Sequence, residues 1–165
     1  FERGHTVGVL PYDPARDCVV LLNQFRVGAL AGGKAGWQTE IVAGVIEDGE
    51  TPEEVARRET LEEAGLQAGN LIPVCHYLVS PGGTSETMRL YCTLIDAGAA
   101  GGIHGLDHEH EDIRVDAVPF DTALAMLQAG TIDNGPAIIA LQWLALNRDR
   151  LRHKAGPGAA RTPAG

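Results

Sequence analysis

Cysteine is scarce in this 165-residue chain, and its scarcity excludes two kinds of structural framework. The three cysteines, Cys18, Cys75 and Cys92, are odd in number, far apart in sequence and form no CxxC pair. A disulfide-bonded scaffold needs several paired cysteines, and a cysteine-ligated zinc site needs closely spaced ones. We therefore expect ordinary reduced thiols, as in a cytoplasmic protein.

Positive charge and long apolar runs are scarce as well. The formal net charge is −9, whereas nucleic acids and anionic membrane surfaces bind basic faces. The longest apolar stretch, from Ala137 to Leu146, is too short to span a membrane and contains Gln142. No secretory signal peptide is recognisable. These features argue against nucleic acid and membranes as partners, and they predict a cytoplasmic location.

The residues that are present suit one compact domain. The length is close to that of a usual single domain, and 44% hydrophobic residues are enough to build a core. We predict a domain over residues 1–154. Residues 155–165 are mostly Gly, Ala and Pro, which predicts a flexible tail.

Apolar spacing predicts a mixture of strands and helices. β-rich runs indicate strands at residues 6–12, 18–26, 37–42, 71–80, 87–95 and 113–118. Helical spacing indicates helices at residues 120–129 and 136–148. A sheet flanked by helices follows, although this pattern fits more than one α/β arrangement.

Acidic side chains crowd one segment, residues 44–66. A helix over residues 52–63 is marked at both ends. Thr51 and Glu54 make a capping box at its start, and Gly65 suits the left-handed residue just beyond its end. The acidic segment is therefore predicted to be a loop followed by a helix.

Three carboxylates of this predicted helix share one face. Glu59, Glu62 and Glu63 stand at i, i+3 and i+4, where like charges repel. A divalent cation among their oxygens would relieve that repulsion. Arg58 adjoins Glu59 and precedes Glu62 by four residues, so its planar fork could hold two of the carboxylates in fixed orientations. The alternative is a solvated acidic helix without a ligand.

The spacing resembles the Nudix box, the signature of hydrolases that cleave nucleoside diphosphates linked to another moiety. The matching positions are Gly44, Glu50, Arg58, Glu59, Glu62, Glu63, Gly65 and Leu66. Thr60 departs from the pattern, because the family usually has an aliphatic residue there, and we expect this change to affect packing rather than ligation. The resemblance implies an α/β (α+β) fold, specifically a Nudix-type α/β/α sandwich with a mixed β-sheet.

A metal site is also implied by the resemblance. Glu59 and Glu63 would hold divalent ions with help from Glu62, and Ala43 would offer its backbone oxygen. Mg²⁺ is the implied ion, with Mn²⁺ as an alternative, at two or three ions per site. The other motif positions would serve its architecture, and these are Gly44, Glu50, Arg58 and Gly65.

A turn downstream resembles one subgroup of the family. Residues 80–86 read SPGGTSE, and Pro81 falls 16 residues after Gly65, as in ADP-ribose pyrophosphatases. Adjacent glycines let a backbone approach a ligand closely. The resemblance implies hydrolysis of ADP-ribose to AMP and ribose 5-phosphate. Implied substrate contacts are Val45, Ser80, Gly82 and Glu86. The alternative for this turn is a plain hairpin.

A second acidic cluster lies at residues 107–112, after a glycine-rich stretch from Gly98 to Gly105. We expect this stretch to lack regular structure and the cluster to ride on a mobile loop that closes over a substrate. By resemblance, Glu109 would be the general base and Glu111 a metal ligand. A transition-metal site is the alternative, but hard Mg²⁺ or Mn²⁺ suits the more numerous carboxylates. The transition-metal alternative arises because His108 and His110 lie in the same cluster.

The remaining expectations concern the phosphate and the assembly. Arg26, at the end of the second predicted strand, occupies the place of a phosphate-binding arginine in the family, and a surface salt bridge is the alternative. The resemblance implies a homodimer and an N-terminal β region that this chain, beginning at Phe1, is expected to lack. Alternative activities are hydrolysis of another nucleoside diphosphate sugar or of a dinucleotide such as NADH, and non-catalytic sensing of ADP-ribose.

Overall fold

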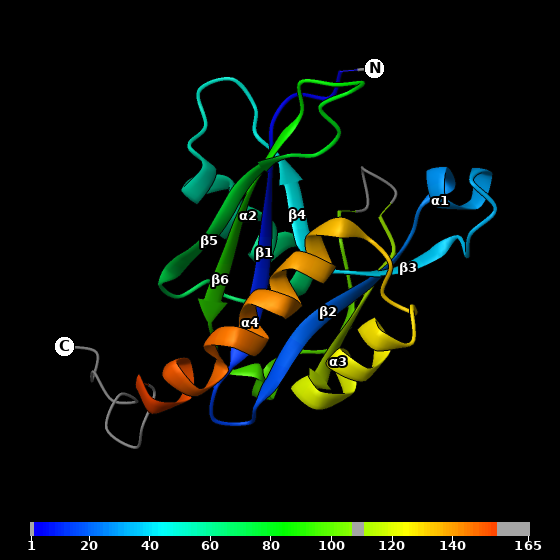
Figure 1. Cartoon of the computed structure of the whole chain (residues 1–165). Helices are drawn as coiled ribbons and strands as arrows, with labels where there is room; N and C mark the ends of the chain where they lie inside the picture. Colours follow the sequence, from blue (N-terminus) through cyan, green and yellow to red (C-terminus); the bar gives the residue numbers. More distant parts are fainter. Residues whose placement is uncertain (1, 107–110, 155–165) are drawn as a thin grey trace.

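The computed structural model describes residues 2–106 and 111–154 and contains one mixed β-sheet with helices on both faces (Figure 1). The strands are β1 (Thr6–Asp13), β2 (Cys18–Phe25), β3 (Trp37–Glu40), β4 (Val42–Val45), β5 (Leu71–Leu78), β6 (Thr87–Leu94), β7 (Gly102–His104) and β8 (Ile113–Pro119). The helices are α1 (Val27–Ala31), α2 (Pro52–Ala64), α3 (Phe120–Gln128) and α4 (Gly135–Lys154), with a short 3-10 helix η1 at Ala97–Ala99.

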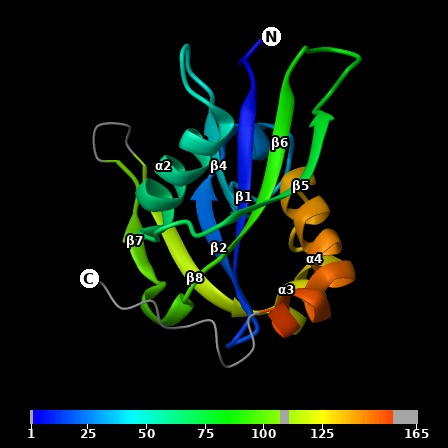
Figure 2. The same cartoon turned by 90° about the vertical axis from the view of Figure 1, so that its left-hand side faces the viewer.

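Three layers are visible when the molecule is seen along the sheet, with α2 on one face and α3 and α4 on the other (Figure 2). Side chains alternate along each strand, so successive residues pack into two separate cores on opposite faces of the sheet. Val9 and Val20 pack in the core that includes α2, whereas their neighbours Leu10 and Leu21 pack in the core that includes α3 and α4. The predicted α/β/α sandwich is confirmed.

The strand order is β5-β6-β1-β2-β8-β7, with β3 paired to β2 and β4 paired to β1. β1 runs parallel to β6, and the other strand pairs are antiparallel. The sheet is therefore mixed, as predicted.

The central strands β1 and β2 pair with each other only near their shared turn, at Tyr12↔Val19 and Asp13↔Cys18. Away from that turn, β4 pairs with the first half of β1, and β3 pairs with the last half of β2. The chain that runs from β3 into β4 therefore lies where the two central strands separate. This separation places Ala43 and Gly44 against α2.

Local chemistry fixes both ends of α2, as the sequence predicts. Thr51 Oγ1 accepts a hydrogen bond from the Glu54 N–H, and the Glu54 carboxylate accepts one from the Thr51 N–H at 2.9 Å. Gly65 adopts a φ of 64°, which is the left-handed C-cap. Thr60 is fully buried, and its hydroxyl donates to the Ala56 carbonyl at 2.6 Å, so a polar side chain fits this core position.

The expectation of an irregular stretch from Gly98 to Gly105 is wrong, because η1 and β7 fall within or overlap it. β7 pairs with β8 from Gly102↔Val115 to His104↔Ile113. The backbone of β8 supplies this pairing, so glycines without apolar alternation can still form a strand. Helix α1 was also missed, since it has no buried residue and hence no amphipathic pattern.

Two further expectations can be compared with the structure. All three cysteines are free, as predicted. Within the described ranges, no helix is both long enough and apolar enough to cross a membrane. The predicted tail, residues 155–165, lies outside the described residues.

Candidate active site

The carboxylates predicted to share a face of α2 lie where β1 and β2 separate. Glu63 is 3% exposed, and its Oε2 accepts a hydrogen bond of 2.9 Å from the Ala43 N–H. Glu59 lies directly over Gly44, where an added Cβ would overlap the Glu59 carboxylate. A side chain at position 44 would therefore displace the Glu59 side chain from its place. The structure brings Ala43, Gly44, Glu59 and Glu63 together.

Arg58 forms hydrogen bonds with three acidic side chains, one of which is Glu59. Its Nη1 donates to Glu59 Oε1 at 2.8 Å and to Glu62 Oε2 at 3.1 Å, and its Nε donates to Glu50 Oε1 at 3.2 Å. One planar guanidinium thus fixes the orientation of carboxylates from α2 and from the loop before it. Glu50, the loop residue, is positioned to hold Arg58 from the other side.

Burial disfavours the charged forms of the Glu59 and Glu63 carboxylates. Burial raises the pKa of Glu59 to about 7, with the Arg58 charge opposing the shift and the Glu62 charge adding to it. Burial also raises the pKa of Glu63 to about 8, against the hydrogen bond from Ala43, and the charges of Glu59 and Glu111 raise it further. An additional positive charge would therefore favour the ionisation of both groups at neutral pH.

Glu111 belongs to the same cluster. Its Oε1 accepts from Gln24 Nε2, and its Oε2 accepts from the Leu106 N–H, each at 3.4 Å. Gly105 has a φ of +102°, and a Cβ there would stand 2.6 Å from Glu111 Cβ, so glycine is required at this position. The charge of Glu111 contributes to the raised pKa of Glu59, which places it within electrostatic reach.

Gln24 was not anticipated from the sequence. It is 8% exposed and lies two residues after Leu22 on β2, on the face that packs toward α2. A polar side chain that continues the inward-facing series of an otherwise apolar strand was the available signal. Such a residue needs a hydrogen-bond partner, and here Glu111 is that partner.

Arg26 follows β2 and forms a two-pronged ion pair with Glu40 at the end of β3. Arg26 Nη2 and Nε donate to Glu40 Oε2 at 2.7 and 3.0 Å. Burial tends to lower the pKa of Arg26, but the carboxylates of Glu40, Glu63 and Glu111 raise it overall. Arg26 therefore lies beside the carboxylate cluster, and its role toward a phosphate stays a prediction.

The predicted substrate turn lies at the tip of the hairpin formed by β5 and β6. The Ser80 carbonyl accepts from the N–H groups of Gly83 and Thr84 at 3.0 Å. Ser85 Oγ donates to Glu2 Oε2 at 2.6 Å. These bonds hold the tip to itself and to the N-terminal segment. They do not join it to the carboxylate cluster. The residues of this turn that are predicted to contact the substrate are Ser80, Gly82 and Glu86.

The other residues named by the sequence predictions are Val45, His108, Glu109 and His110. Val45 ends β4 beside Gly44 and is 39% exposed, but side chains alternate along a strand, so its side chain faces away from the side of Gly44 on which Glu59 lies. Glu109, the predicted general base, lies outside the described residues. His108 and His110, the basis of the transition-metal alternative, lie outside them as well.

The donor set fits a hard divalent cation. Glu59, Glu63 and Glu111 offer carboxylate oxygens, which Mg²⁺ and Mn²⁺ prefer to nitrogen or sulfur ligands. Within residues 2–106 and 111–154, no three acidic, histidine or cysteine side chains already converge on a common metal position. Arg58 draws Glu59 and Glu62 toward itself, so cation binding requires these side chains to turn. Arg58 and the Ala43 N–H do not fully offset the burial of Glu59 and Glu63, since the pKa of both groups is raised, and this favours that change.

Thermal stability should depend on pH and on the cation together. In the folded chain Glu59 and Glu63 stay protonated to about pH 7 and about pH 8, whereas the unfolded chain loses these protons near the ordinary carboxyl value of 4.5. The unfolded state therefore binds fewer protons between these limits. Without a divalent cation, the free energy of unfolding should fall as pH rises through this window.

Mg²⁺ should reverse this loss, because it takes the place of the protons. At 100 times its Kd it stabilises by about 2.7 kcal/mol, which corresponds to a Tm increase of roughly 5–10 °C. We expect a larger Mg²⁺-dependent increase at about pH 8 than at about pH 6 in thermal unfolding against EDTA controls. Equal increases at both pH values, or the same response in a Glu59→Gln/Glu63→Gln variant, would contradict the assignment.

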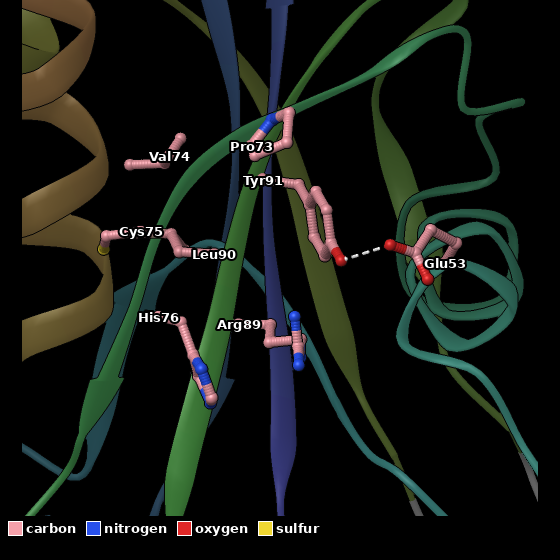
Figure 3. A pocket seen from close by; sticks show the side chains of 8 residues that line it. All are labelled: Glu53, Pro73, Val74, Cys75, His76, Arg89, Leu90 and Tyr91. Carbon is pink, nitrogen blue, oxygen red and sulfur yellow. Dashed lines mark hydrogen bonds between the residues drawn. The ribbon is translucent and has the colours of Figure 1, made fainter.

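A separate pocket lies between the β5–β6 hairpin and the start of α2 (Figure 3). Tyr91 Oη donates to Glu53 Oε1 at 2.7 Å across it, and Arg89 points toward the same side. The residues that line it are Glu53, Pro73, Val74, Cys75, His76, Arg89, Leu90 and Tyr91. None of the site residues predicted from the sequence is among them.

Comparison with known proteins agrees with the geometry. A model of the NUDIX domain matches residues 2–143. The chain belongs to the Nudix family, and it is a Nudix hydrolase. A protein named ADP-ribose pyrophosphatase from Escherichia coli (strain K12) is 49% identical over 154 residues, which cover 93% of this chain and 74% of that protein. A protein of the same name from Haemophilus influenzae is 43% identical, over 91% of this chain and 70% of that protein.

More distant matches include one sequence relative and one solved structure. A protein named GDP-mannose pyrophosphatase from Enterobacter sp. (strain 638) is 35% identical over 89% of this chain and 76% of its own length. The crystal structure of an ADP compounds hydrolase superimposes with a TM-score of 0.71 at 20% identity, covering 90% of this chain and 75% of that chain. The solved structure supports the architecture, and the sequence relatives support the family.

Proposed function

We propose that this chain hydrolyses the pyrophosphate bond of ADP-ribose to AMP and ribose 5-phosphate, with Mg²⁺ as the preferred cation and Mn²⁺ as a substitute. The observation that carries this proposal is the pair of Glu63, which is buried, and Glu59, whose side chain is 15% exposed, beside Ala43 and Gly44 within the Nudix motif. The names of the relatives that are 49% and 43% identical favour ADP-ribose as the substrate.

The carboxylates would hold two or three cations. Glu59 and Glu63 would be the principal ligands, and Glu62, Glu111 and the backbone oxygen of Ala43 would assist. When bound, divalent cations neutralise pyrophosphate oxygens and lower the pKa of water. Such compensation is needed because both the substrate and a chain of net charge −9 are anionic.

The remaining residues would bind the substrate and move a proton. Glu109 would accept the proton of the attacking water, so no protein nucleophile is needed. Arg26 would contact a phosphate through its guanidinium. The expected contacts to the rest of the substrate are Val45, Ser80, Gly82 and Glu86.

The test is incubation with ADP-ribose and Mg²⁺ in ¹⁸O-labelled water, followed by mass spectrometry of both products. We expect AMP and ribose 5-phosphate, with the label in only one of them, and we expect EDTA to stop the reaction. Tight binding of ADP-ribose without turnover would overturn the proposal in favour of a sensor. Turnover that is equally fast in EDTA would overturn the cation requirement.

GDP-mannose is the second candidate substrate, because the relative from Enterobacter is 35% identical over most of this chain. Both compounds contain the same pyrophosphate linkage and differ in the base and the sugar. Comparison of kcat/KM for the two separates them. We expect ADP-ribose to be favoured by at least about tenfold, and the opposite order would transfer the proposal to GDP-mannose.

A further inference from the structure

The ion pair of Arg26 with Glu40 has an unusual placement for a surface contact. Glu40 is opposite Leu22 in the β2–β3 register, and Arg26 follows β2. The Arg26 side chain is 42% exposed and that of Glu40 is 16% exposed. The acidic member of the pair is therefore the more buried of the two, and Gln24, two residues before Arg26, donates to Glu111 of the candidate active site.

The pairing uses one edge of the guanidinium. Nε donates to both oxygens of Glu40, at 3.3 and 3.0 Å, and Nη2 donates to Oε2 at 2.7 Å. Among the described residues, no hydrogen bond is formed by Nη1. A planar fork that is fixed along one edge has the direction of its other edge fixed as well. Glu40 thus determines where the remaining donor points.

Other carboxylates lie within electrostatic reach of Arg26. The charges of Glu63 and Glu111 act on the guanidinium in addition to that of Glu40. Among the described residues only Glu40 also forms hydrogen bonds with the Arg26 side chain, so Glu40 sets the direction of the guanidinium.

We propose that Glu40 is a positioning residue that holds Arg26 ready for a substrate phosphate. This inference rests on the proposed function, in which Arg26 contacts the pyrophosphate. Holding a long side chain in its bound orientation before the substrate arrives removes part of the entropy cost of binding. Loss of Glu40 should therefore weaken substrate binding through Arg26 and through no other group.

The test is a double-mutant cycle on steady-state hydrolysis of ADP-ribose at saturating Mg²⁺. Glu40→Ala should raise KM by about 3- to 10-fold with kcat changed by less than about 2-fold. Glu40→Gln keeps the size of the side chain and one acceptor oxygen, so its KM should lie between those of the unchanged chain and of Glu40→Ala. In an Arg26→Ala background, Glu40→Ala should have no further effect on KM, because its only route of action is gone. A general loss of structure would not give this background dependence.

A matched control is Asp116→Ala. Asp116 accepts from Arg114 Nε at 2.9 Å, in an ion pair on β8 whose side chains are 60% and 50% exposed. This variant should leave KM unchanged. Thermal unfolding of each variant checks that it is folded, and Glu40→Gln serves if the alanine variant is not.

The outcomes separate this inference from the function on which it rests. If Arg26→Ala raises KM but both Glu40 variants do not, the positioning role is wrong and the phosphate role of Arg26 stands. If Glu40→Ala lowers KM, Glu40 competes with the substrate, and the inference is overturned. If neither Arg26→Ala nor Glu40→Ala changes KM, the phosphate role of Arg26 fails and the inference fails with it.

Discussion

Glu63→Gln is expected to slow ADP-ribose hydrolysis by about 10²- to 10³-fold. A divalent cation supplies several kcal/mol of charge stabilisation in such reactions, and each 1.36 kcal/mol is a factor of about ten in rate. Glu63 is 3% exposed and held by the Ala43 N–H, so no neighbouring group can easily replace its carboxylate. The measurement is kcat at saturating ADP-ribose, as a function of Mg²⁺ concentration.

The same variant should be at least as stable as the unchanged chain when no cation is present. Glutamine has nearly the shape of glutamate, and it removes a buried group whose ionisation is unfavourable. The matched control is Glu53→Gln on the first turn of α2, where the amide oxygen can still accept from Tyr91. Normal hydrolysis by Glu63→Gln would rule out Glu63 as a cation ligand. A defect in Glu53→Gln would show that the loss is not specific to the cluster.

Glu109→Gln is expected to lower kcat by about 10²-fold or more and to leave cation binding nearly unchanged. The glutamine amide cannot accept the proton of an attacking water, while the ligands in α2 are unaltered. The measurement combines steady-state kinetics with a Mn²⁺ titration of the same protein. Loss of kcat with retained binding distinguishes a base from a ligand.

Asp112→Asn is the control for this variant, since it removes one negative charge from the same acidic cluster without removing the proposed base. Its kcat should stay within about twofold of the original value. An unchanged kcat in Glu109→Gln would remove Glu109 from the role of general base. Equal losses in both variants would instead indicate an effect of the overall charge of the cluster.

Short-range chemistry explains why α2 was predictable. The capping box at Thr51 and Glu54 and the left-handed Gly65 depend on residues at most a few positions apart, so sequence spacing contains the information. The strands with apolar alternation were predictable for the same reason. The separation of β1 and β2, which places Ala43 beside Glu63, depends on pairings between distant segments. The family resemblance supplied only the expectation that the backbone oxygen of Ala43 would face a metal.

Several features could not be read from local patterns. β7 is a glycine-containing strand that exists because the backbone of β8 pairs with it, and α1 buries no side chain. The contact of Gln24 with Glu111 joins residues 87 positions apart. The contact of Arg26 with Glu40 depends on the register of β2 and β3. Side-chain partners of this kind follow from tertiary structure, and the sequence shows only that a polar residue stands in an apolar series.

The most direct test of the account is a crystal of the chain soaked with saturating Mn²⁺, with the ion located by its anomalous scattering. The account predicts at least one ion within about 2.5 Å of carboxylate oxygens of both Glu59 and Glu63. Arg58 should then have released Glu59. A soaked crystal with Mn²⁺ bound only elsewhere, or with no ion at these two side chains, would contradict the central claim.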